Sequence, residues 1–340
     1  MEEKKVMAIV GLSKNAGKTS LLNWYLKNLE GQKIGVSTTG RDGEDTDLLT
    51  KLPKPKVILP KDVYFTSFEN VFSKHAIMIE GIEKLPFRVI DKHLWLYKTL
   101  GEIETEIVGP STVKEQTDLI DIFQNYGCEL TIIDGSFDRK SISFSDKITD
   151  LLLVIGASAG SIENIKRLSE KLKIYSMFET YSPPLPPPYL NRGRSNGRSS
   201  ENSITYSLNN QLFNTELNSI FGNESAISDI LKQNPEWLHL SGAMTEISWQ
   251  KLKDNIKDYK GKIVFNHPLN ISLGFNDLKY LLDSQKVFTR KRFPISAVAV
   301  NSFSTQNKHI DAETLRNEVK AIFEDMPIID VMEIAAPQSP

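Results

Sequence analysis

The residues of this chain best suited to chemistry lie near its start, where a short apolar run leads into a loop that ends in Gly17-Lys18-Thr19. Such a loop holds negative oxygens, because its backbone N–H groups surround them and the following helix adds the positive end of its dipole. Gly17 leaves room for a phosphate, Lys18 supplies a positive charge, and Thr19 offers a hydroxyl to Mg²⁺. The pattern therefore predicts a site for the phosphate chain of a nucleotide, with Mg²⁺ as cofactor. The candidate nucleotide-binding residues of this loop are Gly11, Lys14, Asn15, Ala16, Gly17, Lys18, Thr19 and Ser20.

The spacing of the loop departs from the common pattern Gly-x4-Gly-Lys-Ser/Thr. That pattern needs glycine at the position of Leu12, whereas here five residues separate Gly11 from Gly17. Lys14 lies inside the loop, and two interpretations of it stay open. It contacts a phosphate, either its own or that of a neighbouring copy in a homodimer, or it is simply exposed to solvent.

A segment after the second predicted strand is a candidate to hold Mg²⁺ or to activate water. Residues 38–47 contain four acidic residues and two glycines. Oxygen ligands suit Mg²⁺, and a loop with glycines suits a segment that responds to the terminal phosphate. We take Asp42 and Asp45 as candidates without ranking them, and a solvated turn is the alternative.

A second acidic candidate is Asp134, which ends the apolar strand at residues 130–133 and is followed by Gly135. This is the Walker B pattern, in which the carboxylate reaches Mg²⁺ directly or through water. Asp138 and Arg139 follow at the same edge as candidate switch residues. The expected catalytic residues are Lys18, Asp42, Asp45 and Asp134, and the expected Mg²⁺ ligands are Thr19, Asp42 and Asp134.

Segments of strand and helix character alternate along nearly the whole chain and must position these residues. Strands are expected at residues 6–10, 33–37, 103–108, 130–133, 151–155, 237–240, 262–265, 296–300 and 328–331. Helices are expected at residues 18–29, 112–126, 161–172, 226–233, 246–258, 276–283 and 312–323. Residues 109–112 either cap the second of these helices or form a second ligand wall, and we favour the cap. The alternation predicts an α/β fold, with a mostly parallel sheet covered by helices on both faces.

The alternation breaks between residues 180 and 202, where a proline-rich stretch precedes a polar, basic one. We expect a nucleotide-binding core at residues 1–179, a flexible Pro/Arg/Ser-rich insertion at 180–203, and a C-terminal α/β continuation of the same fold at 204–335. A separate C-terminal lobe is the competing arrangement. The insertion is a solvated loop, or it is a partner-docking or mobile element near the nucleotide whose charges are Arg192, Arg194 and Arg198.

The composition of the chain argues against several classes of protein. The 340 residues carry a net charge of −2, which gives no general attraction to nucleic acid or to an anionic membrane. The lone cysteine, Cys128, excludes a disulfide framework and fits a reducing compartment. We recognise neither a signal peptide nor an apolar segment long enough to span a bilayer. These features predict a cytoplasmic protein that binds neither nucleic acid nor membrane.

The spacing of the first loop resembles the dethiobiotin synthetase and cobyrinic acid a,c-diamide synthase branch of the P-loop proteins, which also includes the MinD/ParA ATPases. Lys14 lies one position later than the signature lysine of MinD/ParA. More narrowly, residues 11–19, 39–44 and 133–140 look like the ATPase subunit of the lysine 5,6-aminomutase reactivase. Residues 149–150, 156–158 and the Val300-Asn301 strand end are similar as well.

This resemblance implies a P-loop NTPase fold and a chaperone-like ATPase that uses ATP and Mg²⁺. Such a protein binds an adenosylcobalamin-dependent aminomutase together with a second reactivase subunit, and ATP hydrolysis drives exchange of damaged cobalamin. In this branch an acid after the second strand helps to hold Mg²⁺ or to activate water, as Asp42 or Asp45 would. An asparagine at a late strand end often reads the adenine edge there, so Asn301 is a candidate for base recognition, with a plain turn residue as the alternative.

Two other functions stay open. One is an ATP-dependent carboxylate ligase of the dethiobiotin synthetase or diamide synthase type. Its amidotransferase version needs a glutaminase cysteine in the C-terminal half, whereas Cys128 lies in the N-terminal half. The other is a nucleotide-dependent regulatory or assembly protein.

Overall fold

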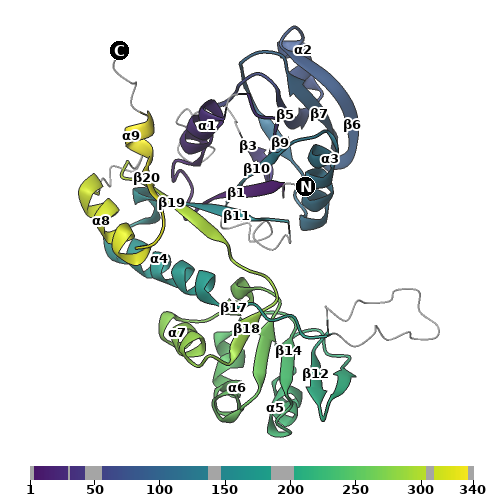
Figure 1. Cartoon of the computed structure of the whole chain (residues 1–340), viewed down its shortest axis with the longest axis vertical. Coiled ribbons are helices and arrows are strands. Elements are labelled where there is room, and N and C mark those ends of the chain that lie inside the picture. Colours follow the sequence, from purple (N-terminus) through teal and green to yellow (C-terminus); the bar gives the residue numbers. More distant parts are fainter. Residues whose placement is uncertain are drawn as a thin grey trace, which may run out of the picture. The chain divides into compact units, whose positions relative to one another are not determined.

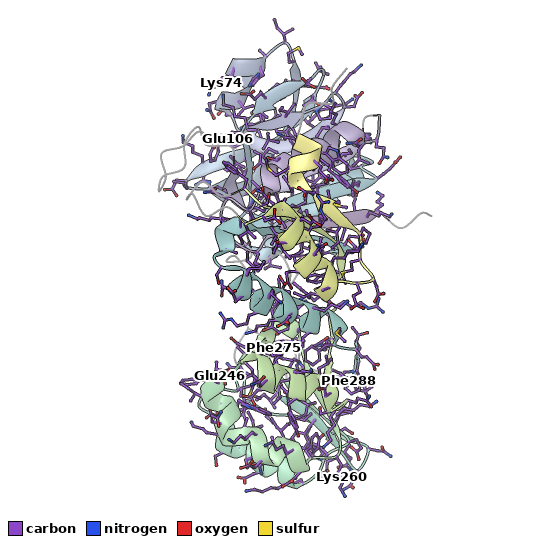
Figure 2. All side chains as sticks on the ribbon, turned by 90° about the vertical axis from the view of Figure 1, so that its left-hand side faces the viewer. Lys74, Glu106, Glu246, Lys260, Phe275 and Phe288 are labelled. Atoms are coloured by element: carbon purple, nitrogen blue, oxygen red, sulfur yellow. The ribbon has the colours of Figure 1, made fainter. Side chains whose placement is uncertain are left out.

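The computed structural model describes residues 4–29, 31–42, 56–136, 147–184, 203–303 and 310–335. The chain forms two compact units, one of Met1–Ser169 with Pro294–Pro340 and one of Glu170–Phe293 (Figure 1). Figure 2 draws the side chains, with Lys74 and Glu106 in the first unit and Glu246 and Phe288 in the second.

The first unit is built on a large, mostly parallel sheet. Within the described residues this sheet has nine strands in the order β20-β19-β11-β1-β10-β2-β5-β7-β6. Their bounds are β1 (Lys5–Gly11), β2 (Ile34–Thr38), β5 (Val63–Phe68), β6 (Ile79–Val89), β7 (Lys92–Thr99), β10 (Leu130–Ser136), β11 (Asp150–Gly156), β19 (Ile295–Asn301) and β20 (Ile328–Asp330). Neighbours from β20 to β5 run parallel, whereas β7 pairs antiparallel with both β5 and β6. The predicted α/β class with a mostly parallel sheet is confirmed.

Helices cover this sheet on both faces. The helices of the first unit are α1 (Lys18–Asn28), α2 (Asn70–His75), α3 (Val113–Asn125), α8 (Ala312–Ile322) and α9 (Val331–Ala335), and α4 (Ile162–Met177) crosses the division between the units. Leu22 of α1 packs in one core cluster with Phe65 of β5, and Phe123 of α3 packs in another with Tyr64. Since successive strand residues face opposite sides of a sheet, α1 and α3 cover opposite faces.

Short strands flank the main sheet. The predicted strand at residues 103–108 is instead two strands, β8 (Ile103–Thr105) and β9 (Ile107–Gly109). They pair antiparallel with β4 (Val57–Leu59) and β3 (Gly40–Asp42), respectively. The single predicted strand was wrong because its two halves bond to different partners. The predicted cap is confirmed, since the Thr112 side chain accepts a hydrogen bond from Glu115 N at the start of α3.

The second unit has a sheet of its own. In its described part, five strands lie in the order β13-β12-β14-β16-β18. They are β12 (Thr205–Leu208), β13 (Gln211–Asn214), β14 (Trp237–Leu240), β16 (Lys262–Phe265) and β18 (Val287–Thr289), with β15 (Met244–Thr245) and β17 (Ile271–Ser272) as a separate pair. Its helices are α5 (Glu224–Lys232), α6 (Glu246–Asp258) and α7 (Phe275–Asp283).

This division differs from the predicted continuation of one fold over residues 204–335. The strands up to Thr289 belong to the separate sheet, whereas β19 returns to pair with β11 of the first sheet. The competing separate lobe therefore describes Glu170–Phe293, and the chain after Phe293 completes the first unit. Most of the predicted insertion at 180–203, including Arg192, Arg194 and Arg198, lies outside the described residues.

Within the described part of the chain, no helix is long and apolar enough to cross a membrane.

Candidate functional site

The candidate site lies at the carboxyl edge of the parallel sheet in the first unit. β1 is flanked by β10 and β11, so that Gly11 pairs with Ser136 on one side and Val154 on the other. Asp134 pairs with Thr38 at the end of β2, and Gly156 pairs with Asn301 at the end of β19. In open α/β sheets, ligands bind outside the carboxyl ends of the strands. The predicted loop, Asp134 and Asn301 all lie at or next to such ends.

The backbone of the loop turns sharply before α1. Asn15 has φ 57° and Gly17 has φ 100°, both in the left-handed region. A run of backbone that alternates in hand turns successive N–H groups to one side and forms a concavity for an anion. A side chain at Gly17 would be strained in this conformation, which accounts for glycine at this position.

The N-terminus of α1 offers further donors. In the described residues of α1 no side chain caps the helix, and its first turn carries no acidic residue. The first intrahelical bond runs from Leu21 N to Gly17 O at 3.1 Å, so the N–H groups of Lys18, Thr19 and Ser20 have no acceptor within the helix. These donors, with the positive end of the helix dipole, favour a bound anion.

Lys18 folds back over the loop. A Cβ atom built on Gly11 would lie 3.1 Å from Lys18 Cδ and 3.2 Å from Lys18 Cγ, so the lysine stem runs against the end of β1. Glycine at position 11 makes room for this path. This path keeps the Lys18 side chain beside the loop. Lys14 is exposed and Ala16 is buried, and both interpretations of Lys14 stay open.

The neighbouring strand β11 supports the first half of the loop. Leu12 N donates to Val154 O at 2.8 Å, and the Ser13 and Ser158 hydroxyl oxygens lie 2.7 Å apart. A Cβ on Gly156 would lie only 2.8 Å from Ala16 Cα. The backbone around Ala16 therefore rests directly on the end of β11.

The structure describes some of the acidic candidates fully and others in part or not at all. Asp134 is 2% exposed in β10, and its carbonyl oxygen accepts from Thr39 N at 2.9 Å. Thr19, the other described Mg²⁺ candidate, is half-buried at the start of α1. The backbone of Asp42 ends β3, directly after β2, but its side chain lies outside the described residues, as does the whole of Asp45.

Asn301 touches the loop from β19. Its Nδ2 donates to Ala16 O at 3.2 Å, and its Oδ1 accepts from Phe303 N at 3.1 Å. The residue is 6% exposed. The contact with a base stays a prediction, because the observed contacts of the Asn301 amide are with the protein.

Gln116 is a site residue that the sequence analysis missed. It lies on α3, 3% exposed, and its Nε2 donates to Thr38 O at 2.9 Å and to Pro110 O. It thus holds the end of β2, from which the acidic segment departs. The available signal was a polar residue on the apolar face of the predicted helix at 112–126.

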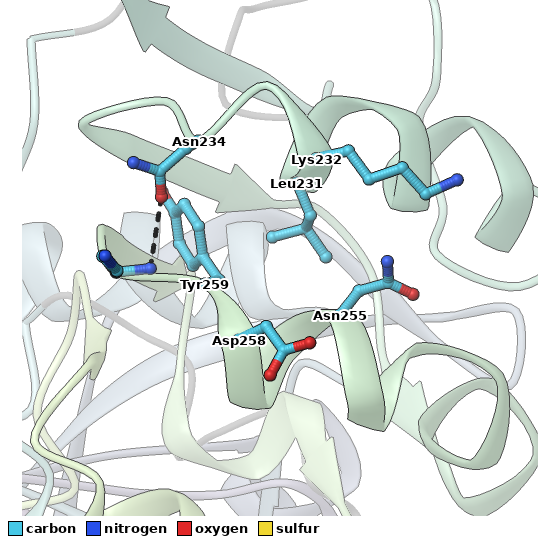
Figure 3. Close-up of a pocket in the computed structure, with 7 residues that line it drawn as sticks. Leu231, Lys232, Asn234, Asn255, Asp258 and Tyr259 are labelled. Carbon is cyan, nitrogen blue, oxygen red and sulfur yellow. Dashed lines mark hydrogen bonds between the residues drawn. The ribbon is translucent and has the colours of Figure 1, made fainter.

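A hollow of about 300 Å³ lies in the second unit, at the C-terminal ends of α5 and α6 (Figure 3). At its edge, Lys260 N donates to Asn234 Oδ1 at 3.3 Å, the hydrogen bond drawn dashed in Figure 3. Its lining residues are Leu231, Lys232, Asn234, Asn255, Asp258, Tyr259 and Lys260. None of the predicted site residues lines it.

Among the described residues, His, Cys, Asp and Glu form no group of three or more that could hold a metal ion.

A comparison with known proteins found no match: no protein-family model matches the chain, and neither the curated proteins nor the solved structures searched gave a match.

The contact between Gly156 and Ala16 predicts that the variant Gly156→Ala is destabilised. The added methyl group meets backbone that cannot rotate away, and overpacking of this kind costs about 1–3 kcal/mol. Chemical denaturation measures this loss in the free energy of unfolding. The control Ser158→Ala removes only the half-buried hydroxyl that contacts Ser13 of the loop, and it should cost less than about 1 kcal/mol. Wild-type stability in Gly156→Ala would contradict the close packing described above.

Proposed function

We propose that this chain binds Mg²⁺-ATP at the loop of residues 11–20 and hydrolyses it, with a P-loop NTPase fold in its first unit. The observation that carries the proposal is the path of Lys18, whose stem lies against Gly11 beside the uncapped start of α1. A cation on this path and a concave row of N–H groups meet the needs of a phosphate chain. The position of the loop after the central strand β1 supports the same proposal.

The residues at this edge also suit Mg²⁺, which prefers oxygen ligands. Thr19 would offer its hydroxyl from the start of α1, Asp134 its carboxylate from β10, and Asp42 its carboxylate from the end of β3. When bound, Mg²⁺ would neutralise charge on the phosphate oxygens. Lys18 would hold the same oxygens from the loop, and Asp42 or Asp45 would orient the attacking water.

We further propose that the ATPase acts on a protein partner, as the reactivase resemblance implies. The partners would be an adenosylcobalamin-dependent aminomutase and a second reactivase subunit. One observation disfavours the amidotransferase version of the ligase alternative. Cys128 is 1% exposed, and burial raises its pKa to about 12. A buried, protonated thiol is a poor nucleophile, so Cys128 does not suit glutaminase chemistry.

An ATPase assay separates these functions. The rate of phosphate release is measured for the chain alone, with an aminomutase inactivated by damaged cobalamin, and with small carboxylic acids. Stimulation by the inactivated aminomutase, and not by the intact enzyme, is expected. Stimulation by a carboxylic acid alone would support the ligase instead. A slow rate that neither addition changes would favour the regulatory or assembly protein.

Lys18→Ala should weaken ATP binding about 10- to 100-fold, because a charge-assisted hydrogen bond to phosphate contributes about 1.5–3 kcal/mol. Isothermal titration with Mg²⁺-ATP measures the change in Kd. The matched control is Lys27→Ala, an exposed lysine in the last turn of the same helix. Its Kd should equal that of the wild type. Equal binding by wild type and Lys18→Ala would overturn the phosphate site.

Asp134→Asn tests the proposed Mg²⁺ ligand with little change in shape. Hydrolysis should fall by about two orders of magnitude, whereas ATP binding should weaken less than about tenfold, because the metal matters most as charge develops in the transition state. Single-turnover kinetics and titration measure the two effects separately. Losses of equal size would argue against a role in the chemical step.

A further inference from the structure

The amide of Asn301 joins the end of β19 to the loop between β1 and α1, across 285 residues of sequence. Its nitrogen donates to Ala16 O at 3.2 Å, and its oxygen accepts from Phe303 N at 3.1 Å. Both ends of the amide are therefore engaged by backbone, in a position only 6% exposed.

The glycine at position 17 leaves room for the Asn301 side chain to reach Ala16. A Cβ atom on Gly17 would lie 2.7 Å from Asn301 Nδ2 and 3.3 Å from Val331 Cγ1. Any side chain there would push the asparagine away from the loop. The glycine thus serves two needs at once, the left-handed backbone and the close approach of Asn301.

The strand edge that carries Asn301 is itself held firmly. Asp330, 7% exposed at the end of β20, accepts from Met332 N at 2.9 Å and from Arg316 Nη2 at 2.6 Å. These bonds fix the start of α9, where Val331 packs in the core cluster that includes Leu22 of α1. These contacts support the neighbouring strand β20, which pairs with the end of β19 that carries Asn301.

The direction of the Ala16 carbonyl decides the direction of the next amide. In a planar trans peptide, the C=O of residue 16 and the N–H of residue 17 point in opposite directions. A donor that holds Ala16 O on the side of β19 turns the Gly17 N–H to the other side. That N–H belongs to the row of donors expected to face the phosphates.

We infer that Asn301 is a positioning residue for phosphate: it holds the peptide between Ala16 and Gly17 in the orientation that binds the phosphate chain. This role rests on the proposed function and differs from the predicted reading of the base. A base reader affects only ligands that carry a base. A residue that positions the loop affects every ligand that carries the phosphate chain.

The test compares Mg²⁺-ATP with Mg²⁺-tripolyphosphate, which has the phosphate chain and no base. Isothermal titration gives both Kd values for the wild type, Asn301→Ser and Asn301→Leu. The leucine variant keeps the volume and removes both hydrogen bonds, and the serine variant keeps polarity if leucine does not fold. Both should weaken the two ligands by the same factor, about fivefold for one net hydrogen bond.

A matched control separates positioning from general stability. Val300→Ala removes buried methyl groups from the same strand and leaves the Asn301 amide in place. It should lower the melting temperature and leave both Kd values unchanged.

Two results would overturn the role of Asn301 alone. One is weaker ATP binding with unchanged tripolyphosphate binding, and the other is unchanged binding of both. A wild type that binds neither ligand would overturn the proposed function as well.

Discussion

The candidate site depends on one close approach, that of the backbone at residues 15–17 to the ends of β11 and β19. A Cβ atom on Gly156 would lie 2.8 Å from Ala16 Cα, and Asn301 bonds the Ala16 carbonyl. Because the back of the loop is bonded to protein, its N–H groups on the other side keep their direction without help from a ligand. Such preorganisation is what electrostatic binding of an anion requires.

Much of the fold could be predicted because its elements carry strong local signals. The helix at residues 246–258 was predicted with the bounds of α6, and the strands that became β1, β10 and β11 were found within a few residues. Apolar periodicity and a cap such as Thr112 are local properties, so a single sequence displays them.

Some of the parts that were missed depend on pairing between distant segments. The return of β19 to β11 follows a second unit of Glu170–Phe293, and nothing local in β19 distinguishes the two sheets. The strand at residues 103–108 was divided because its halves bond to β4 and β3. Gln116 was missed for a related reason, since its partner Thr38 lies 78 residues away. Of the candidate site, the loop and Asp134 were proposed from their spacing in the sequence, whereas the bond from Asn301 to Ala16 needed coordinates.

The phosphate site proposed at this loop is tested most directly by a crystal structure with Mg²⁺ and a non-hydrolysable ATP analogue. We predict phosphate oxygens within hydrogen-bond distance of the backbone N–H groups of residues 15–19 and of Lys18 Nζ, with Mg²⁺ beside Thr19 and Asp134. An analogue bound away from this loop, or with its phosphates turned out of it, would contradict the proposed site.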